Sequence, residues 1–414
     1  MQAGSEFGQC RLCGGPLRHT FVDLGMSPLC ESYVAAEQLN RMEPFYPLRA
    51  LVCESCFLVQ LGEFVAPGEI YSEYAYFSSY SEYWLRHARE YVEMISKRLG
   101  LGRDNLVIEL ASNDGYLLQY FVQKSIPVLG IDPAANIAPH AIKKGVPTLV
   151  RFFGVETARE ILAQSRQADL LLGNNVLAHV PALNDFIAGM KLLLKPGGVI
   201  TLEFPHLCRL MEGNQFDTIY HEHFSYFSFL TAEKALARHE LTVFDVEELP
   251  THGGSLRVYA RHSEDGTKPV TPRVAELRRQ EQKLGFERLE TYTAFDGQVK
   301  ETKRKLLDFL IATRRAGKSV AGYGAPGKGN TLLNYCGVRT DFLDYTVDRN
   351  PYKQGKFLPG TRIPIFAPER IRQTKPDFVL ILPWNLKDEI AHQLAYVREW
   401  GGRFVVPIPE VSVF

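Results

Sequence analysis

The chain has 414 residues, more than one hydrophobic core usually organises, so two or three domains are expected. Lys plus Arg and Asp plus Glu total 47 each, and this balance gives no overall attraction to nucleic acid or to an anionic membrane. No apolar run approaches the ~20 residues that cross a bilayer, and the polar start at residues 1–9 lacks the basic and apolar regions of a secretory signal. We therefore expect a cytoplasmic protein with no nucleic-acid, membrane or obligate protein partner.

Two CxxC pairs near the N-terminus form the first motif, Cys10 with Cys13 and Cys53 with Cys56. The two-residue spacing lets each pair of thiolates grip one tetrahedral metal from a tight turn, and four cysteines indicate zinc. The alternative is a set of buried or redox thiols. The sequence favours a zinc that organises the N-terminal lobe and has no catalytic part. The remaining cysteines are isolated and are expected to be small packed residues: Cys30, Cys208 and Cys336.

An aromatic and serine-rich run at residues 71–84 leads into a helical pattern that continues to Leu99. Tyrosine rings can stack on a base, and their hydroxyl groups can bond sugar and phosphate oxygens. Tyr76 and Tyr80 are therefore candidate substrate contacts. A lid packed over a domain boundary is the alternative for this run.

The middle of the chain alternates apolar strands with helical patterns, which predicts an open α/β sheet. The strand at residues 105–110 carries Glu109 near its end and passes into a small, polar turn at residues 111–115. Such a turn lets a ligand approach the backbone closely. The strand at residues 128–131 again ends in an acid, Asp132, placed to accept hydrogen bonds from the hydroxyls of a ribose. Further strands are expected at residues 168–172 and 198–203, with a helix at 183–194.

These motifs, taken in order with the run from Asn174 to Val180 and the turn at residues 194–198, resemble those of class I S-adenosylmethionine-dependent methyltransferases. The resemblance extends along nearly the whole chain to the sugar C-methyltransferases of deoxysugar biosynthesis. It implies an α/β protein with a four-cysteine zinc lobe at residues 1–75, a Rossmann-like methyltransferase domain at 76–250 and a Rossmann-like, nucleotide-sugar-binding domain at 251–414.

The same resemblance implies which residues bind S-adenosylmethionine. Asp132 is expected on the ribose, and Phe153 is a candidate to stack on adenine, although this ring could equally face the core. The residues expected near the methionine end or approaching the cofactor from the fourth strand are Glu109, Ser112, Asn113, Asp114, Gly115, Asn174 and Asn175.

A glycine-rich turn near residue 324 supports a competing hypothesis. Gly322, Gly324 and Gly327 satisfy GxGxxG, and Asp348 is a later acidic strand end, so the chain could be an NAD-dependent oxidoreductase. Pro326 crowds this turn, however, and the central domain has the more complete cofactor signature. We therefore expect the glycine amides and Lys328 to hold the diphosphate of a nucleotide sugar. Two further candidate substrate contacts are His252, in the turn before the strand at 255–259, and Asn330. A third hypothesis is a noncatalytic, zinc-containing assembly factor.

Tyr220, His221, Glu222 and His223 form a consecutive acid/base run. The resemblance implies a 4-keto deoxysugar linked to thymidine diphosphate, with a 3-amino sugar preferred and a 3-hydroxy sugar left open, from which a base removes the C-3 proton. We expect His223 to be that base, because neutral imidazole accepts a proton near pH 7. Glu222 is the alternative base or an electrostatic partner. Tyr220 is expected to hydrogen-bond the 4-keto oxygen, and His179 to polarise it or position the sugar.

Neighbouring residues on a strand point to opposite faces. If the run is extended, Tyr220 and Glu222 share one side and His221 shares the other with His223, whereas a turn or helix would change that partition. His221 is therefore expected to pack or to form hydrogen bonds. A metal site on the two histidines is disfavoured, because no third ligand lies nearby in the sequence.

Overall fold

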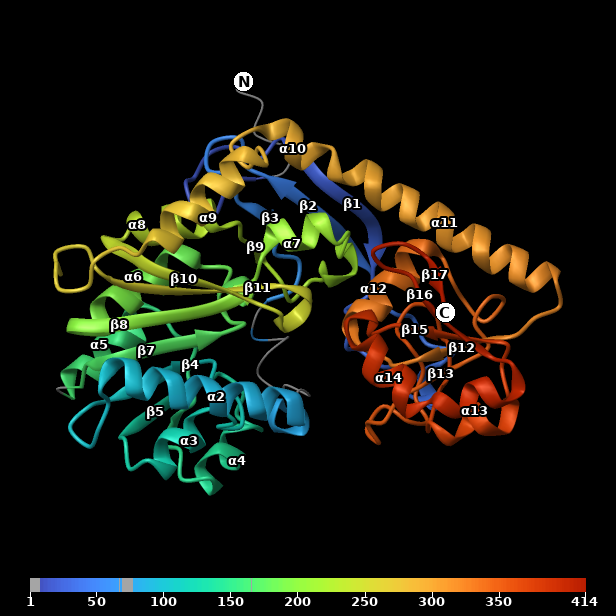
Figure 1. Ribbon diagram of the computed structural model, residues 1–414, viewed down its shortest axis with the longest axis horizontal. Helices are drawn as coiled ribbons and strands as arrows, with labels where there is room; N and C mark the ends of the chain where they lie inside the picture. The colour runs from blue at the N-terminus through green and yellow to red at the C-terminus, as the bar shows by residue number, and fades with distance from the viewer. Residues whose placement is uncertain (1–7, 67, 69–76, 165) are drawn as a thin grey trace.

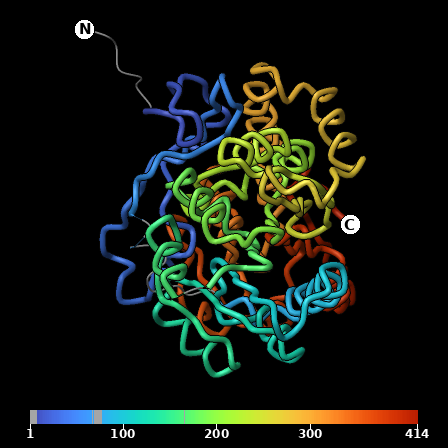
Figure 2. The backbone as a smooth tube through the Cα atoms, turned by 90° about the vertical axis from the view of Figure 1, so that its left-hand side faces the viewer, coloured from blue at the N-terminus to red at the C-terminus, as the bar shows by residue number. Residues whose placement is uncertain are grey.

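A computed structural model describes residues 8–66, 68, 77–164 and 166–414. It contains three sheets, of four, seven and six strands. Figure 1 shows the central and C-terminal domains side by side, with the N-terminal lobe and a helical bridge above them. In Figure 2 the N-terminal lobe, in blue, extends along one edge of the molecule. None of the described helices is both long and apolar enough to cross a membrane.

The N-terminal lobe is a four-stranded antiparallel sheet in the order β1-β2-β3-β9. Three strands are local in sequence and the fourth comes from the central part of the chain: β1 (His19–Ser27), β2 (Tyr46–Val52), β3 (Val59–Leu61) and β9 (Ser225–Tyr226). A short turn, η1 (Ala36–Gln38), lies between β1 and β2. Because β9 directly follows the acid/base run, the edge of this sheet reaches the candidate active site.

The central sheet has seven strands in the order β10-β11-β8-β7-β4-β5-β6. All neighbours pair in parallel except β11, which is antiparallel to both β8 and β10. This arrangement confirms the predicted α/β fold. The strands are β4 (Val107–Leu110), β5 (Val128–Ile131), β6 (Thr148–Leu149), β7 (Ala168–Asn174), β8 (Leu194–Pro205), β10 (Leu241–Leu249) and β11 (Ser255–His262).

Helices cover both faces of this sheet and bury alternate strand residues. Ile108 packs in the core with helices α5, α6 and α8, whereas its neighbour Val107 packs with α2 and α3. Helix α2 starts where the Ser81 side chain accepts the Trp84 N–H, and it ends at Gly100, whose φ of 63° allows a left-handed cap. The helices are α2 (Glu82–Leu99), α3 (Leu118–Gln123), α4 (Ala138–Lys143), α5 (Val155–Ala163), α6 (Leu183–Leu193), α7 (Leu207–Glu212) and α8 (Phe229–Ala237), with short turns η2 (Ser78–Tyr80), η3 (Leu177–His179), η4 (Phe216–Thr218) and η5 (Thr251–Gly253).

Strand β11 extends the central sheet beyond residue 250, where the sequence analysis ended the methyltransferase domain. Its pairing with β8 is a long-range antiparallel contact, which local patterns do not reveal. Residues 255–262 therefore belong structurally to the central sheet.

The charged region at residues 274–314 forms three helices instead of one continuous helix. Gly285, with φ of 86°, falls between two helices, and the rings of Phe21 on β1 and Phe295 stack at 4.7 Å. The region forms a packed bridge over the N-terminal lobe, visible along the top of Figure 1. Its helices are α9 (Pro272–Lys283), α10 (Leu289–Thr293) and α11 (Phe295–Arg315).

The C-terminal sheet has the order β14-β13-β12-β15-β16-β17, and only β17 is antiparallel to its neighbour. The strands are β12 (Val320–Tyr323), β13 (Thr346–Val347), β14 (Ile365–Phe366), β15 (Phe378–Ile381), β16 (Arg403–Val406) and β17 (Ser412–Val413). The helices are α12 (Gly327–Cys336), α13 (Glu369–Thr374) and α14 (Lys387–Gln393), with η6 (Trp384–Leu386) and η7 (Ala395–Trp400).

Candidate active site

The four cysteines of the two CxxC pairs come together in the N-terminal lobe, with all their Sγ atoms within 4.8 Å of one another. The Cys10–Cys56 and Cys13–Cys53 sulfur distances are each 3.5 Å. Tetrahedral zinc with Zn–S bonds of about 2.3 Å requires sulfur atoms about 3.8 Å apart. The donor set and the spacing therefore fit a four-cysteine structural zinc, as predicted.

The turn that the sequence predicts for the cofactor follows β4, beside the carboxyl ends of β5 and β7. After Glu109 the chain takes positive φ at Ala111 (56°), Asn113 (48°) and Gly115 (74°). A Cβ on Gly115 would lie 3.2 Å from the Cα of Ala141, so this turn and helix α4 approach closely. The backbone N–H of Asn113 donates to Asp132 Oδ2 at 2.8 Å. This bond joins the turn after β4 to the acidic end of β5.

Buried polar atoms without a hydrogen-bond partner among the described residues gather at this turn. Buried polar groups normally have partners, so a cluster that lacks them indicates the place of a polar ligand. Both carboxylate oxygens of Glu109 belong to it, and burial, then the charges of Asp132 and Asp114, raise the pKa of this carboxyl. The other atoms are Ser112 Oγ, Asp114 Oδ1, Asn174 Nδ2 and Asn175 Oδ1. This set fits the polar and cationic methionine end of S-adenosylmethionine.

Phe153 packs edge-on against Phe186 of α6, with ring centroids 5.4 Å apart. It also borders Gly189, where an added Cβ would lie 3.1 Å from the Phe153 ring. These are the core contacts that the sequence analysis held open as the alternative. Adenine stacking by Phe153 stays a prediction.

The acid/base run is a turn and not a strand. The His223 N–H donates to the Tyr220 carbonyl at 2.9 Å, and the Tyr220 and His223 rings lie 4.1 Å apart at the same side. His221 turns instead to the N-terminal lobe, where its Nε2 lies 3.2 Å from the Pro47 carbonyl oxygen. The turn thus changes the partition expected for an extended run: it pairs the predicted base with the predicted keto-oxygen donor.

The imidazole of His223 is held in one tautomer. Its Nδ1 lies 2.9 Å from the Thr218 carbonyl oxygen. Because a carbonyl oxygen can only accept a hydrogen bond, Nδ1 carries the proton of the neutral ring and Nε2 is unprotonated. Burial lowers the pKa of His223 to about 4. His179 lies edge-on at 4.7 Å, and burial, then the neighbouring His223, holds the pKa of His179 well below its usual value. Both imidazoles are therefore neutral at pH 7.

Glu222 turns its carboxylate toward the N-terminal lobe, where Cys30 Sγ lies 3.8 Å from its Oε1. The side chain is buried, and its backbone carbonyl bonds the ring of His179. Burial, then the Glu222 charge, raises the pKa of the Cys30 thiol. These contacts suit an electrostatic and structural partner better than a base that must reach a substrate.

Residues 77–80 dock onto the cofactor turn. The Ser78 N–H donates to Asn113 Oδ1 at 2.9 Å, and Lys144 Nζ bonds both Ser79 Oγ (2.5 Å) and Asp114 Oδ2 (3.0 Å). Tyr80 is 66% exposed, and its pKa is raised by burial and by Tyr352 of the C-terminal domain. Tyr80 therefore lies on the side of the central domain that faces Tyr352. Tyr76 lies outside the described residues.

His252 lies beside Asn175, the residue that follows β7. Its Nε2 is 3.0 Å from Asn175 Nδ2, and its ring meets Trp84 edge-on at 5.1 Å. Trp84 in turn stacks on Tyr116 at 6.0 Å, directly after the cofactor turn. The predicted substrate residue His252 and the predicted cofactor residue Asn175 are therefore direct neighbours.

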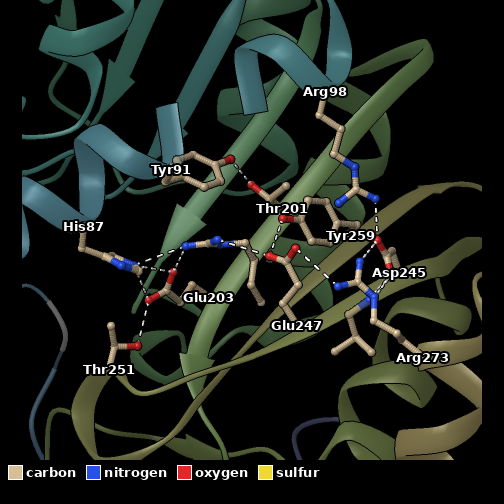
Figure 3. A network of polar contacts seen from close by, with 12 residues as sticks. His87, Tyr91, Arg98, Thr201, Glu203, Asp245, Glu247, Thr251, Tyr259 and Arg273 are labelled. Carbon is tan, nitrogen blue, oxygen red and sulfur yellow. Dashed lines mark hydrogen bonds and ion pairs between the residues drawn. The ribbon is translucent and has the colours of Figure 1, made fainter. Parts of the chain in front are cut away.

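A buried ionic network that was not predicted from the sequence lies next to His252 (Figure 3). Glu203, at the end of β8, accepts from His87 Nε2 at 2.9 Å, Arg257 at 2.7 Å and the Thr251 hydroxyl at 3.0 Å. The network continues through Glu247 toward Asp245 (Figure 3). Burial alone would raise the pKa of Glu203. The bonds from His87 and Arg257 outweigh this effect and hold the pKa below its usual value. A third acidic strand end, at residue 203, was the available signal.

Lys328 lies on the first turn of α12, with Nζ 4.4 Å from the centre of the Trp384 ring and bonded to Asn385. Burial lowers the pKa of Lys328 to about 8, against the attraction of Asp217. Burial lowers the pKa of His252. The charge of Glu203 opposes this shift, and the charge of Lys328 adds to it. The charge of Lys328, in the C-terminal domain, therefore acts on His252 of the central sheet region.

Asn330 is 1% exposed, and its amide donates to the Cys30 carbonyl at 2.6 Å. This bond fixes the N-terminal lobe to α12. The Asn330 Oδ1 atom is buried and has no hydrogen-bond partner among the described residues, and its role as a substrate contact stays a prediction.

The glycine-rich turn at residues 322–327 is already occupied by the chain itself. A Cβ on Gly327 would lie 2.9 Å from Cys30 Sγ and 3.1 Å from Glu31 Oε1. The Gly324 and Ala325 amides donate to the Val347 carbonyl and the Asp348 carboxylate, both at 2.7 Å. A dinucleotide would need this surface and the Asp348 carboxylate. The bonds of Gly324, Ala325 and Asp348 therefore oppose NAD binding here, whereas a diphosphate held by the amides at the start of α12 stays a prediction.

Family models cover most of the chain. A model described as "Putative zinc binding domain" matches residues 10–71, "Methyltransferase domain" matches 83–246, and "C-methyltransferase C-terminal domain" matches 250–409. The chain is 37% identical over 405 residues to C-methyltransferase NovU of Streptomyces niveus, covering 98% of this chain and 96% of that protein.

Two solved structures are similar to part of the chain. A S-adenosylmethionine-dependent methyltransferase from Clostridium acetobutylicum is 12% identical with a TM-score of 0.34, covering 43% of this chain and 92% of that one. Magnesium protoporphyrin IX methyltransferase from Synechocystis, with bound S-adenosylmethionine, is 16% identical with a TM-score of 0.33, covering 44% and 82%. These two likenesses add nothing to what the family models show.

Proposed function

Because this chain belongs to the S-adenosylmethionine-dependent C-methyltransferases, we propose that it methylates C-3 of a 4-keto deoxysugar linked to thymidine diphosphate. A saturated sugar carbon is not nucleophilic. A ketone at C-4 makes the C-3 proton acidic, so a base can convert C-3 into a carbon nucleophile. The observation that carries the proposal is a neutral imidazole, His223, stacked beside the hydroxyl-bearing Tyr220.

His223 Nε2 takes the C-3 proton, and the electron pair of that C–H bond moves into a C3–C4 double bond while the 4-keto oxygen becomes an enolate oxygen. Tyr220 donates a hydrogen bond to this oxygen as its charge develops, and His179 holds the oxygen or positions the ring. S-adenosylmethionine supplies the electrophilic methyl group to C-3 and leaves as S-adenosylhomocysteine. The chain's own task is to hold C-3 in line with that methyl group and to exclude water.

On this proposal the cofactor lies across the ends of β4, β5 and β7. Asp132 binds the ribose hydroxyls, while Glu109, Ser112 and Asp114 face the methionine end together with the backbone of Asn113 and Gly115. Asn174 and Asn175 approach from β7, and Phe153 borders adenine. The support is the cluster of buried polar atoms that lack partners among the described residues.

The nucleotide sugar lies between the central and C-terminal domains. Lys328 supplies the charge for the diphosphate, His252 contacts the sugar side, and Tyr80 borders the thymine. We propose a 3-amino-2,3,6-trideoxy sugar, the substrate class of D-tetronitrose formation, with a 3-hydroxy sugar as the alternative. The electrostatic effect of Lys328 on His252 supports one ligand that touches both.

The deciding experiment incubates the protein with S-adenosylmethionine and thymidine diphosphate 4-keto sugars that carry either an amino or a hydroxyl group at C-3. Nuclear magnetic resonance of the product then locates the new methyl group. We expect it on C-3, with the 3-amino sugar turned over faster. A methyl group on oxygen, on nitrogen or on another carbon would refute the proposed chemistry. Calorimetry with NAD is the parallel test of the oxidoreductase alternative, and no binding is expected.

A further inference from the structure

Gln60 stands between the zinc site and the catalytic turn. It lies on β3, is 1% exposed, and donates from Nε2 to Cys10 Sγ at 3.1 Å. Its Oε1 accepts from the Arg11 backbone N–H at 3.0 Å and from Arg11 Nε at 3.4 Å. One side-chain amide thus holds both a metal ligand and the next residue of the same CxxC turn.

The backbone around Gln60 continues directly into the catalytic turn. Gln60 pairs with Ser225 across β3 and β9, and the Leu61 N–H donates to the Phe224 carbonyl at 3.0 Å. Phe224 is the residue that follows His223. The position of β3 therefore sets where the chain leaves the turn that carries the predicted base.

Arg11 makes a second connection between the same two places. Its guanidinium donates to the Leu61 carbonyl and lies over the ring of Phe224, with Cζ 5.5 Å from the ring centre. The carbonyls of Arg11 and Leu12 accept from Asn184 Nδ2 on α6, at 2.9 and 3.0 Å. The CxxC turn is thus anchored to the methyltransferase domain and pressed against the residue beside His223.

We propose that Gln60 and Arg11 are positioning residues, which transmit the geometry of the zinc-bound CxxC turn to His223 through Phe224 and Ser225. The zinc then acts on the reaction only through these two side chains. This inference rests on the proposed role of His223 as the base. A displacement of about 1 Å at a reacting group can cost about 100-fold in rate, so a loosened β3–β9 edge is expected to slow proton removal without altering cofactor binding.

The test compares Gln60→Met, which keeps the side-chain length and all four cysteines, with the control Gln9→Met, an exposed glutamine next to Cys10. For Gln60→Met we expect one zinc per chain, S-adenosylhomocysteine affinity within about twofold of wild type, and a fall of about 10-fold or more in kcat and in C-3 proton exchange in heavy water, with KM unchanged. The nitrogen chemical shifts of the His223 ring should also move. Gln9→Met should match wild type in each of these measurements.

Arg11→Lys is the second variant, because lysine keeps the charge but cannot bond Leu61 and lie over Phe224 as a planar group. Gln60→Met and Arg11→Lys with wild-type exchange rates and unmoved His223 signals would overturn the inference. Loss of zinc from Gln60→Met, together with a wild-type exchange rate in Arg11→Lys, would also overturn it. If His223→Asn leaves exchange intact, the proposed base is wrong, whereas moved His223 signals in Gln60→Met would still show the connection.

Discussion

His223 donates a hydrogen bond from Nδ1 to the Thr218 carbonyl oxygen at 2.9 Å. The bond directs the unprotonated Nε2 away from η4, and burial lowers the pKa of the ring to about 4. A base that is already neutral needs no deprotonation before turnover at pH 7. The tautomer and the protonation state are thus both set in the protein without substrate.

The pH dependence of proton removal follows from this pKa. Because His223 works as a base only when unprotonated, the rate of C-3 proton exchange should be constant from pH 6 to 8 and fall on the acid side with an inflection near pH 4. His223→Asn should lower the exchange rate by about 100-fold to 10,000-fold. The control His221→Asn, whose ring contacts Pro47, should keep the wild-type profile. An inflection near pH 6.5 would exclude His223 as the base.

Glu109 should make cofactor binding depend on pH. Burial and the nearby Asp132 and Asp114 raise its pKa, so in the free protein the carboxyl stays protonated to a higher pH than usual. A bound ammonium group favours the carboxylate, so binding should release a proton, and affinity should fall as the pH is lowered through that raised pKa. Calorimetry of S-adenosylhomocysteine in two buffers of different ionisation enthalpy measures the release.

Glu109→Gln should abolish this proton release and weaken binding about 10-fold to 100-fold, because a bond to a charged group is lost. Glu160→Gln, on the exposed face of α5, is the control and should bind as wild type. Equal heats in the two buffers for the wild-type protein would show that Glu109 does not take part.

Features set by adjacent residues could be predicted from the sequence. The two CxxC pairs and the acid-ended strands at Glu109 and Asp132 are local patterns, and each occurs where the sequence placed it. Their chemistry depends on spacing along the chain, which the sequence contains in full. The α/β fold followed from the alternation of such segments.

Features set by distant residues could not be predicted in this way. The strand β9 completes a sheet whose other strands lie more than 150 residues earlier, and Cys30 fills the surface of Gly327 from the opposite end of the chain. The turn at His223 depends on the Thr218 carbonyl, a backbone group that every residue carries. No residue pattern could therefore distinguish that turn from a strand.

Lys328 should make nucleotide binding weaker in alkaline solution. Its pKa is lowered to about 8, so the ammonium group loses its charge as the pH rises through that value. The affinity for thymidine diphosphate should therefore decrease between pH 7 and 9. Lys328→Arg should remove this dependence because guanidinium stays charged, and Lys328→Gln should bind weakly at both values. Calorimetry measures each affinity, and S-adenosylhomocysteine binding is the control; equal affinity in Lys328→Gln and wild type would move the diphosphate elsewhere.

Glu203 should be a main determinant of the stability of the central domain. Its fully buried carboxylate pairs with Arg257 at 2.7 Å and His87 at 2.9 Å, so Glu203→Gln leaves a buried guanidinium partly uncompensated. Removing one partner of a buried pair costs about 3–5 kcal/mol, and we expect the free energy of unfolding in urea to fall by that amount. Because the pKa of Glu203 is lowered in the folded state, the stabilisation is present above its unfolded pKa and is lost as the pH falls through the folded value. The exposed pair of Lys191 and Glu264 is the control: Glu264→Gln should leave unfolding unchanged, and an equally small effect of Glu203→Gln would mean that the network contributes no net stability.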